Sequence, residues 1–299
     1  MSVVSVITDS SSSIPDEMYD RYELIVVPYY VHVEGQPYRD LVDMTREAFL
    51  RHLLATTKAE QFPKSANPGA GDYLDAFRRA FERGPQMVAL NMTSSGSGAY
   101  QAALLAKGMF LEEQPEARVE VIDTRNVSMC HGWMSIEAAR AAQAGRSLEE
   151  IVARVDSMIP VTRMIQTADT LKYLYLGGRI GRAQHLMGSI LRIKPLISMD
   201  DGIIVSLGTA RSRRFAYRRM MEIMDQDVPS GGTVKAAVIH FGAPEDASAL
   251  REMIQDRFDC MELIVTELSP ALAVHTGPGT VGVCYFPPGL TRIPSGEAA

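Results

Sequence analysis

Residues 87–100 read Met-Val-Ala-Leu-Asn-Met-Thr-Ser-Ser-Gly-Ser-Gly-Ala-Tyr, an apolar run followed by a loop of small residues. The run Met87–Met92 predicts a buried strand, and the alanine-rich segment Ser97–Phe110 predicts a helix. A strand, a short polar loop and a helix in this order are typical of an α/β domain with a parallel sheet. Backbone N–H groups at such a helix start also form an anion site, with Ser97 and Gly98 as the expected contacts. The alternative is a serine cap at an ordinary helix start.

Strand-like and helix-like segments alternate on both sides of this stretch. The strands are expected at Val3–Thr8, Leu24–Val33 and Val119–Ile122, and the helices at Thr45–Leu54, Tyr73–Phe81, Trp133–Gln143 and Leu148–Met158. After Pro160 the pattern changes to a hairpin at Leu196–Leu207, a basic helix at Ser212–Met224, and strands at 234–240 and 261–266. We therefore predict two domains, an N-terminal α/β domain with a parallel sheet over residues 1–160 and a C-terminal α/β domain over residues 161–299.

The composition of the chain is that of an ordinary globular protein. Of its 299 residues, 46% are hydrophobic and 22% are charged, and the formal net charge is −6, which argues against general affinity for nucleic acid. No apolar run has the length of a membrane span, and the N-terminus lacks a signal peptide. The three cysteines, at positions 130, 260 and 284, form no Cys-x-x-Cys pair. We read them as reduced thiols in a cytoplasmic protein, and we expect no metal site and no cofactor.

Leu171–Ile197 contains the sequence Gly-Gly-Arg at 177–179, with Gly181, Arg182 and an apolar run after them. Paired glycines allow a sharp turn, which sets Arg179 on a tight corner ahead of an apolar helix. A cation displayed in this way suggests recognition of an anion or of an acidic partner. The basic helix that begins after Arg211 is either a solvated face or a second docking patch.

Several other polar segments are candidates for chemistry. Three of them are Asp9-Ser10, Ser65-Ala66-Asn67-Pro68 and Asp123-Thr124. Each is either a helix cap or turn, or part of one common site. His275 stands just before Gly277-Pro278-Gly279, where a flexible backbone favours a close approach. Ser97, His275 and either Asp123 or Asp9 can be combined into a hydrolase triad, although no Gly-x-Ser-x-Gly segment is present.

Taken in order, these segments resemble the DegV family of bacterial fatty-acid-binding proteins over nearly the whole chain. The matching segments are Thr8-Asp9-Ser10, Ser97-Gly98-Ala99-Tyr100-Gln101, Asp123-Thr124, Leu174–Ile180, Ile193-Lys194-Pro195 and His275–Gly279. The resemblance implies a two-domain α/β fold that encloses one long-chain fatty acid in a tunnel between the domains. It also implies that the carboxylate is bound by Ser65, Ser97, Gly98 and His275.

The resemblance further implies a protein that is not itself an enzyme. The bound acid is presented to an ATP-dependent kinase related to dihydroxyacetone kinase, which forms an acyl phosphate for phospholipid synthesis. Arg179 resembles the arginine implicated in docking that kinase, and we add Arg211 to the same docking surface. Transient contact with a membrane is also expected. The competing hypothesis is an enzyme, a small-molecule hydrolase or a phosphotransferase acting at the Ser97 loop.

Two loops depart from the family pattern. The family loop usually reads Thr/Ser-Ser-Gln-Pro where this chain has Ser65-Ala66-Asn67-Pro68, and Ala99 replaces a usual threonine. Each change removes a hydroxyl, so fewer head-group contacts are expected. Burying a tail of about sixteen carbons at roughly 0.8 kcal/mol per CH₂ gives a gross gain of about 12 kcal/mol. The tail is therefore expected to dominate affinity, and the head group to fix orientation.

Overall fold

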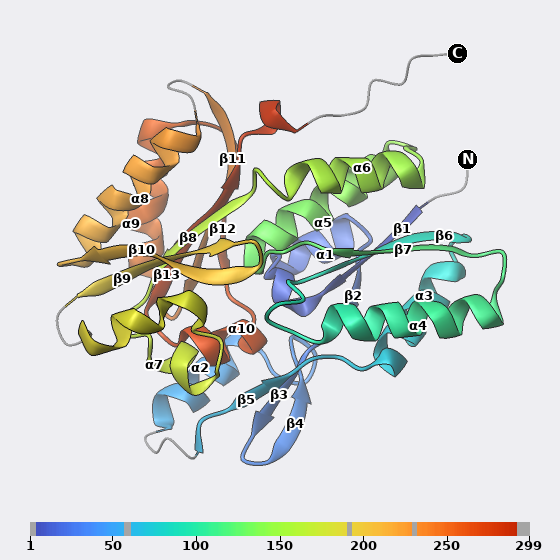
Figure 1. Ribbon diagram of the computed structural model, residues 1–299, viewed down its shortest axis with the longest axis horizontal. Helices are drawn as coiled ribbons and strands as arrows, with labels where there is room; N and C mark the ends of the chain where they lie inside the picture. Colours follow the sequence, from blue (N-terminus) through green and yellow to red (C-terminus); the bar gives the residue numbers. More distant parts are fainter. Residues whose placement is uncertain (1–3, 57–60, 190–192, 229–231, 292–299) are drawn as a thin grey trace. The chain divides into compact units, whose positions relative to one another are not determined.

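The computed structural model describes residues 4–56, 61–189, 193–228 and 232–291. The chain forms two compact units (Figure 1). The first unit comprises Met1–Pro28, Asn67–Val161 and Gly289–Ala299, and the second comprises Tyr29–Ala66 and Thr162–Pro288. The predicted boundary at residue 160 lies beside the break at Val161. Residues 29–66 nevertheless belong to the second unit, which a linear division at residue 160 does not anticipate.

The first unit is a parallel α/β structure. Its sheet has the strand order β2-β1-β6-β7, and each neighbouring pair is parallel. Helices α5 and α6 lie on one face and α3 and α4 on the other (Figure 1). The strands are β1 (Val4–Asp9), β2 (Ile25–Val27), β6 (Gln86–Asn91) and β7 (Arg118–Asp123). The helices are α1 (Asp16–Arg21), α3 (Ala70–Phe81), α4 (Ala99–Glu113), α5 (Ser128–Gln143) and α6 (Leu148–Met158).

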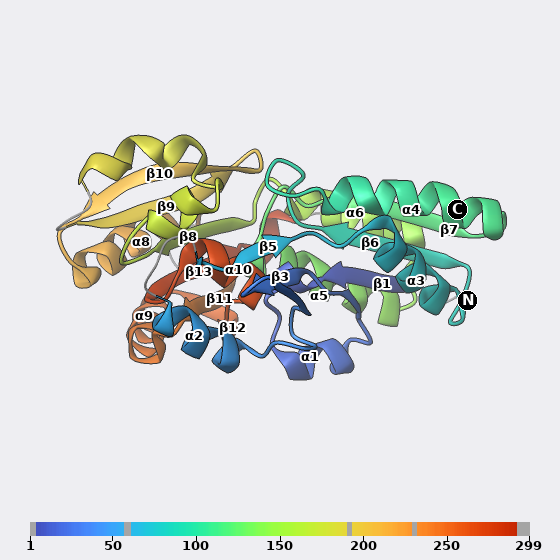
Figure 2. The same cartoon turned by 90° about the horizontal axis from the view of Figure 1, so that it is seen from below.

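The second unit is built on a mixed sheet in the order β10-β9-β8-β13-β11-β12. Only β11 and β12 pair in parallel among these strands, and a short antiparallel sheet β4-β3-β5 lies beside α10 (Figure 2). The strands are β3 (Tyr30–Val33), β4 (Gln36–Arg39), β5 (Lys64–Ala66), β8 (Arg163–Thr167), β9 (Lys194–Asp200), β10 (Ile203–Ala210), β11 (Thr233–Phe241), β12 (Asp259–Glu267) and β13 (Thr280–Phe286). The helices are α2 (Arg46–Ala55), α7 (Lys172–Leu176), α8 (Arg213–Asp227), α9 (Pro244–Arg257) and α10 (Pro270–Thr276).

The predicted fold class, an N-terminal parallel-sheet domain followed by a second α/β domain, is confirmed. The prediction of one strand over Leu24–Val33 is wrong. The segment breaks at Pro28 into β2 and β3, which belong to different sheets, because proline has no N–H to donate to a central strand. The apolar run after Arg182 begins as the 3₁₀ helix Gly181–Ser189, and its continuation at 190–192 lies outside the described residues.

No disulfide joins Cys130, Cys260 or Cys284 among the described residues, and Cys130 and Cys284 are buried. Among the residues that the structure describes, no helix combines the length and the apolar character needed to cross a membrane.

Two tight hairpins in the second unit use the same turn with different residues. Asp201 and Gly202 join β9 to β10, with φ of 46° and 78°, and Glu34 and Gly35 join β3 to β4, with φ of 52° and 80°. A two-residue loop with positive φ at both positions is a type I′ turn, which favours Asn or Asp before Gly. The glutamate at position 34 therefore sits in a conformation that its side chain disfavours.

We expect Glu34→Asn to stabilise the protein by about 0.5–1 kcal/mol, because asparagine adopts positive φ at lower cost. Glu34 is exposed, so the substitution removes no core packing. The free energy of unfolding in urea measures the effect. Glu34→Thr, a β-branched residue at the same φ, should be destabilising, and equal stability of the two variants would contradict this account of the turn.

Candidate functional site

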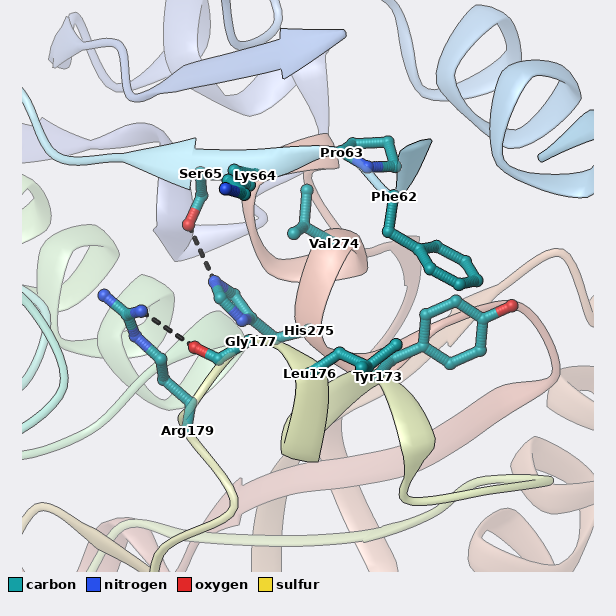
Figure 3. Close-up of a pocket in the computed structure, with 10 residues that line it drawn as sticks. All are labelled: Phe62, Pro63, Lys64, Ser65, Tyr173, Leu176, Gly177, Arg179, Val274 and His275. Carbon is teal, nitrogen blue, oxygen red and sulfur yellow. Dashed lines mark hydrogen bonds between the residues drawn. The ribbon is translucent and has the colours of Figure 1, made fainter. Parts of the chain in front are cut away.

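A pocket of about 240 Å³ lies within the second unit (Figure 3). Three segments far apart in sequence form it: the residues around β5, the helix α7 with the turn after it, and the end of α10. Its lining residues are Phe62, Pro63, Lys64, Ser65, Tyr173, Leu176, Gly177, Arg179, Val274 and His275. None of these ten residues is acidic, so the pocket offers hydrogen-bond donors and cations beside an apolar wall.

Ser65 and His275 form the polar centre of the pocket. The Ser65 Oγ and the His275 Nε2 are 2.7 Å apart, a hydrogen bond between residues 210 positions apart in sequence (Figure 3). Ser65 is placed by β5, where it pairs with Val31 of β3, and His275 lies in the last turn of α10. The structure thus brings together two of the four predicted carboxylate ligands.

Two glycines allow the helices to approach this closely. A Cβ placed on Gly177 would overlap with the Nδ1 of His275, and a Cβ on Gly277 would overlap with the ring of Tyr173. Gly277 also has a positive φ of 74°, and it ends α10 two residues after His275. The backbone at Gly177, the residue that follows α7, therefore packs against the imidazole itself, a contact that sequence reasoning did not predict.

His275 is neutral at physiological pH. Burial, helped by the positive charge of Arg179, lowers the pKa of His275 to about 4. The Nδ1 of this imidazole is buried and has no hydrogen-bond partner in the described structure. A neutral imidazole carries one N–H. With that proton on Nε2, His275 donates to the Ser65 Oγ, which leaves the Ser65 hydroxyl proton for a ligand oxygen.

Cations surround the polar centre. Arg179 is exposed, and its Nη1 donates to the Gly177 carbonyl at 2.8 Å (Figure 3). Lys64 is also exposed at the pocket, and the Nζ of Lys172 lies 4.8 Å from the centre of the Phe62 ring. Long-range attraction therefore favours an anion here, while the closest donors are uncharged.

The apolar wall consists of aromatic and aliphatic side chains. The rings of Phe62 and Tyr173 are 5.5 Å apart and nearly perpendicular, and Leu176 and Val274 complete this side of the pocket (Figure 3). A ligand that suits both the cationic rim and the apolar wall of the pocket carries an anionic head and an apolar chain.

Ser97 and Gly98 lie in the other unit, at the start of α4. The Ser97 Oγ accepts a hydrogen bond from the Ala99 N–H at 3.2 Å, so this serine serves the helix start. Gly98 is the N-cap residue of α4, and a Cβ there would lie 3.1 Å from the Oδ1 of Asn67. The role of Ser97 and Gly98 in ligand binding stays a prediction.

The carboxylates proposed for a hydrolase triad have structural partners. Buried Asp9 accepts backbone N–H groups from Ser11 and Met92, both at 3.0 Å, and Asp123 accepts those of Ser94 and Arg125. His275 is hydrogen-bonded to Ser65, with no acidic residue lining its pocket. The arrangement gives the hydrolase hypothesis no support.

The second predicted docking residue, Arg211, is exposed and precedes Ser212, the N-cap of α8. No group of three or more His, Cys, Asp or Glu side chains is placed to hold a metal within the described part of the chain.

The described fold is a two-unit α/β protein whose second unit holds a pocket with cationic side chains at its rim and an apolar wall. Comparison with known proteins identifies the family of the chain. The chain belongs to the DegV family, because the family model described as "Uncharacterised protein, DegV family" matches residues 3–288.

Relatives and solved structures cover almost the whole chain. A DegV domain-containing protein of Streptomyces coelicolor is 34% identical, over 94% of this chain and 97% of its own length, and one of Clostridium perfringens is 32% identical, over 94% and 98%. A Thermus thermophilus DegV family protein described for its fatty acid binding has a TM-score of 0.87 at 28% identity, covering 95% and 99% of the two chains. A stearic acid-binding protein of Eubacterium ventriosum has a TM-score of 0.85 at 26% identity, covering 95% and 98%.

Proposed function

We propose that this protein binds one long-chain fatty acid and holds its carboxylate at the Ser65–His275 pair. The observation that carries the proposal is the 2.7 Å hydrogen bond between these residues in a pocket lined by apolar and cationic side chains. The similar proteins of known structure that bind fatty acids support the choice of ligand.

The chemistry of the pocket suits a carboxylate. A carboxylate removed from water needs hydrogen bonds, and the neutral Ser65–His275 pair supplies one donor without a buried countercharge. Arg179 and Lys64 add attraction from the exposed rim. Phe62, Tyr173, Leu176 and Val274 offer apolar surface to the carbons next to the head group. On the resemblance alone, we also propose Ser97 and Gly98 as further donors, which Ser97→Ala would test by ligand retention.

We further propose that the carrier presents the carboxylate to an ATP-dependent fatty acid kinase in the cytoplasm, with transient membrane contact during loading. The family resemblance suggests the kinase, and the exposed guanidinium of Arg179 at the pocket supports it. Arg211 is another exposed cation in the same unit, and we propose that it belongs to the same docking surface.

We expect Arg179→Ala to leave the fatty acid bound while lowering the rate of its phosphorylation at least about tenfold, as for loss of a docking cation at an interface. The rate is measured with the partner kinase and labelled ATP, and retention by lipid extraction of the same sample. Arg251→Ala, on the exposed face of α9 and outside the lining of the pocket, is the control. Loss of the lipid itself from Arg179→Ala would assign Arg179 to ligand binding instead of docking.

The proposal is tested by solvent extraction of the purified protein followed by mass spectrometry of the lipid. One fatty acid per chain supports the carrier. A lipid-free protein that fails to take up added palmitate and hydrolyses small esters would favour the hydrolase alternative.

A further inference from the structure

The side chain of Arg213, at the start of α8, reaches the turn that follows the pocket histidine. Its Nη2 donates to the Gly279 carbonyl at 2.5 Å and to the Oδ1 of Asp169 at 2.9 Å. Arg213 is partly buried, whereas the next residue, Arg214, is exposed. One cation of the basic helix is thus directed at the backbone of residues 277–279.

Asp169 links this guanidinium to the segment that leads into α7. Its carboxylate also accepts from the Nζ of Lys194, and it precedes Lys172, the first residue of α7, by three positions. Gly279 has a φ of 79°, and a Cβ there would overlap with the Asp169 carboxylate. Arg213 therefore joins the 277–279 turn, through the Gly279 carbonyl, to the segment before α7, through the Asp169 carboxylate.

The two segments that Arg213 and Asp169 join, the one that contains α7 and the 277–279 turn, contact His275 or its neighbours. On the α7 side, Gly177 packs against the Nδ1 of His275 and Tyr173 packs against Gly277. On the other side, the turn is closed by Thr280, whose Oγ1 donates to the carbonyls of Thr276 and Gly277 at 3.1 and 3.0 Å. The orientation of the imidazole thus depends on two backbone segments that Arg213 and Asp169 hold together.

We propose that Arg213 is a positioning residue for ligand binding, which acts through Asp169 and the 277–279 turn to hold His275 against α7. It lies outside the lining of the pocket and makes no contact with Ser65 or His275 among the interactions of the described residues. Its further partners, the Asp246 carboxylate at 3.3 Å and the Tyr217 hydroxyl at 3.4 Å, anchor it to α9 and to the next turn of α8. The effect on ligand affinity rests on the proposed function, whereas the effect on His275 does not.

The test uses Arg213→Met, Arg213→Lys and, as the matched control, Arg251→Met on the exposed face of α9. Two quantities are measured in the full-length protein: the Kd for radiolabelled palmitate by equilibrium dialysis, and the pKa of His275 by NMR titration of its ring nitrogens. Arg213→Met should raise the Kd about tenfold and move the pKa of His275 upward, toward 6.5, as water reaches the loosened imidazole. Arg213→Lys, which restores one donor, should fall between Arg213→Met and the wild type, and Arg251→Met should match the wild type.

A wild-type Kd and a wild-type His275 pKa in Arg213→Met would overturn the inference. So would a weaker Kd with an unchanged pKa, since a general loss of packing explains that result. If Arg213→Met does not fold, the pKa of His275 in Arg213→Lys decides in its place. If the wild-type protein binds no palmitate, the proposed function fails, and the titration of His275 alone decides the positioning role.

Discussion

Gly177→Ala is expected to weaken fatty-acid binding by about a hundredfold or more while the protein stays folded. The backbone at Gly177 has a φ of −78°, which alanine adopts without strain, so the substitution acts through space and not through the backbone. The added methyl group would overlap with the Nδ1 of His275. The imidazole must then move, and the 2.7 Å hydrogen bond to Ser65 cannot be kept in the same geometry. Loss of about 2.8 kcal/mol of head-group binding corresponds to the hundredfold change.

Gly178→Ala is the matched control for this prediction. Gly178 is the adjacent residue, but its φ is 67° and no atom lies within 4 Å of a Cβ placed there. Alanine at 178 should therefore cost about 1 kcal/mol of stability and leave the affinity for palmitate unchanged. The two variants are compared by palmitate titration and by urea unfolding. Equal affinities for palmitate in the two variants would show that the contact between Gly177 and His275 has no part in binding.

The second large effect is a loss of stability at low pH, caused by His275. The pKa of His275 is about 4 in the native protein, against an ordinary value of 6.5. Below pH 6.5 the unfolded chain therefore binds a proton that the native protein binds only near pH 4, and the contribution of His275 to stability falls as the pH falls through this window. Between pH 7.5 and pH 5.0 the expected loss from His275 is about 2 kcal/mol.

The measurement is the free energy of unfolding of lipid-free protein in urea at these two pH values. His275→Gln removes the titrating group, so the difference in stability between pH 7.5 and pH 5.0 should shrink by about 2 kcal/mol. Burial also lowers the pKa of His131 and of His240, which leaves a residual loss of the same sign in both proteins. An equal loss in the wild type and in His275→Gln would contradict the neutral, desolvated imidazole on which the site depends.

Local signals predicted much of the fold. The helix Leu148–Met158 was predicted with its observed ends, and its start is fixed by a reciprocal pair, the Ser147 hydroxyl and the Glu150 carboxylate, each accepting the other's backbone N–H. The hairpin at Asp201-Gly202 follows equally from its turn residues. Leu24–Val33 was predicted wrongly because its apolar pattern continues across Pro28, while the chain moves to a different sheet there.

Local sequence signals predicted less of the site than of the fold. Ser65 and His275 were proposed from the family resemblance, since no periodicity connects residues 210 positions apart. The glycine pair at 177 and 178 correctly predicted a turn that displays Arg179, but nothing in the sequence indicates that one of these glycines touches an imidazole ring. Phe62 and Tyr173 were missed for the same reason, because tertiary packing alone places them at the pocket.

The most direct test of the central claim is the crystal structure of the protein with bound palmitate. The account predicts a carboxylate oxygen within hydrogen-bond distance, about 2.6–3.2 Å, of the Ser65 Oγ or of a ring nitrogen of His275. A palmitate carboxylate bound elsewhere, with the Ser65–His275 pair intact and unliganded, would contradict it.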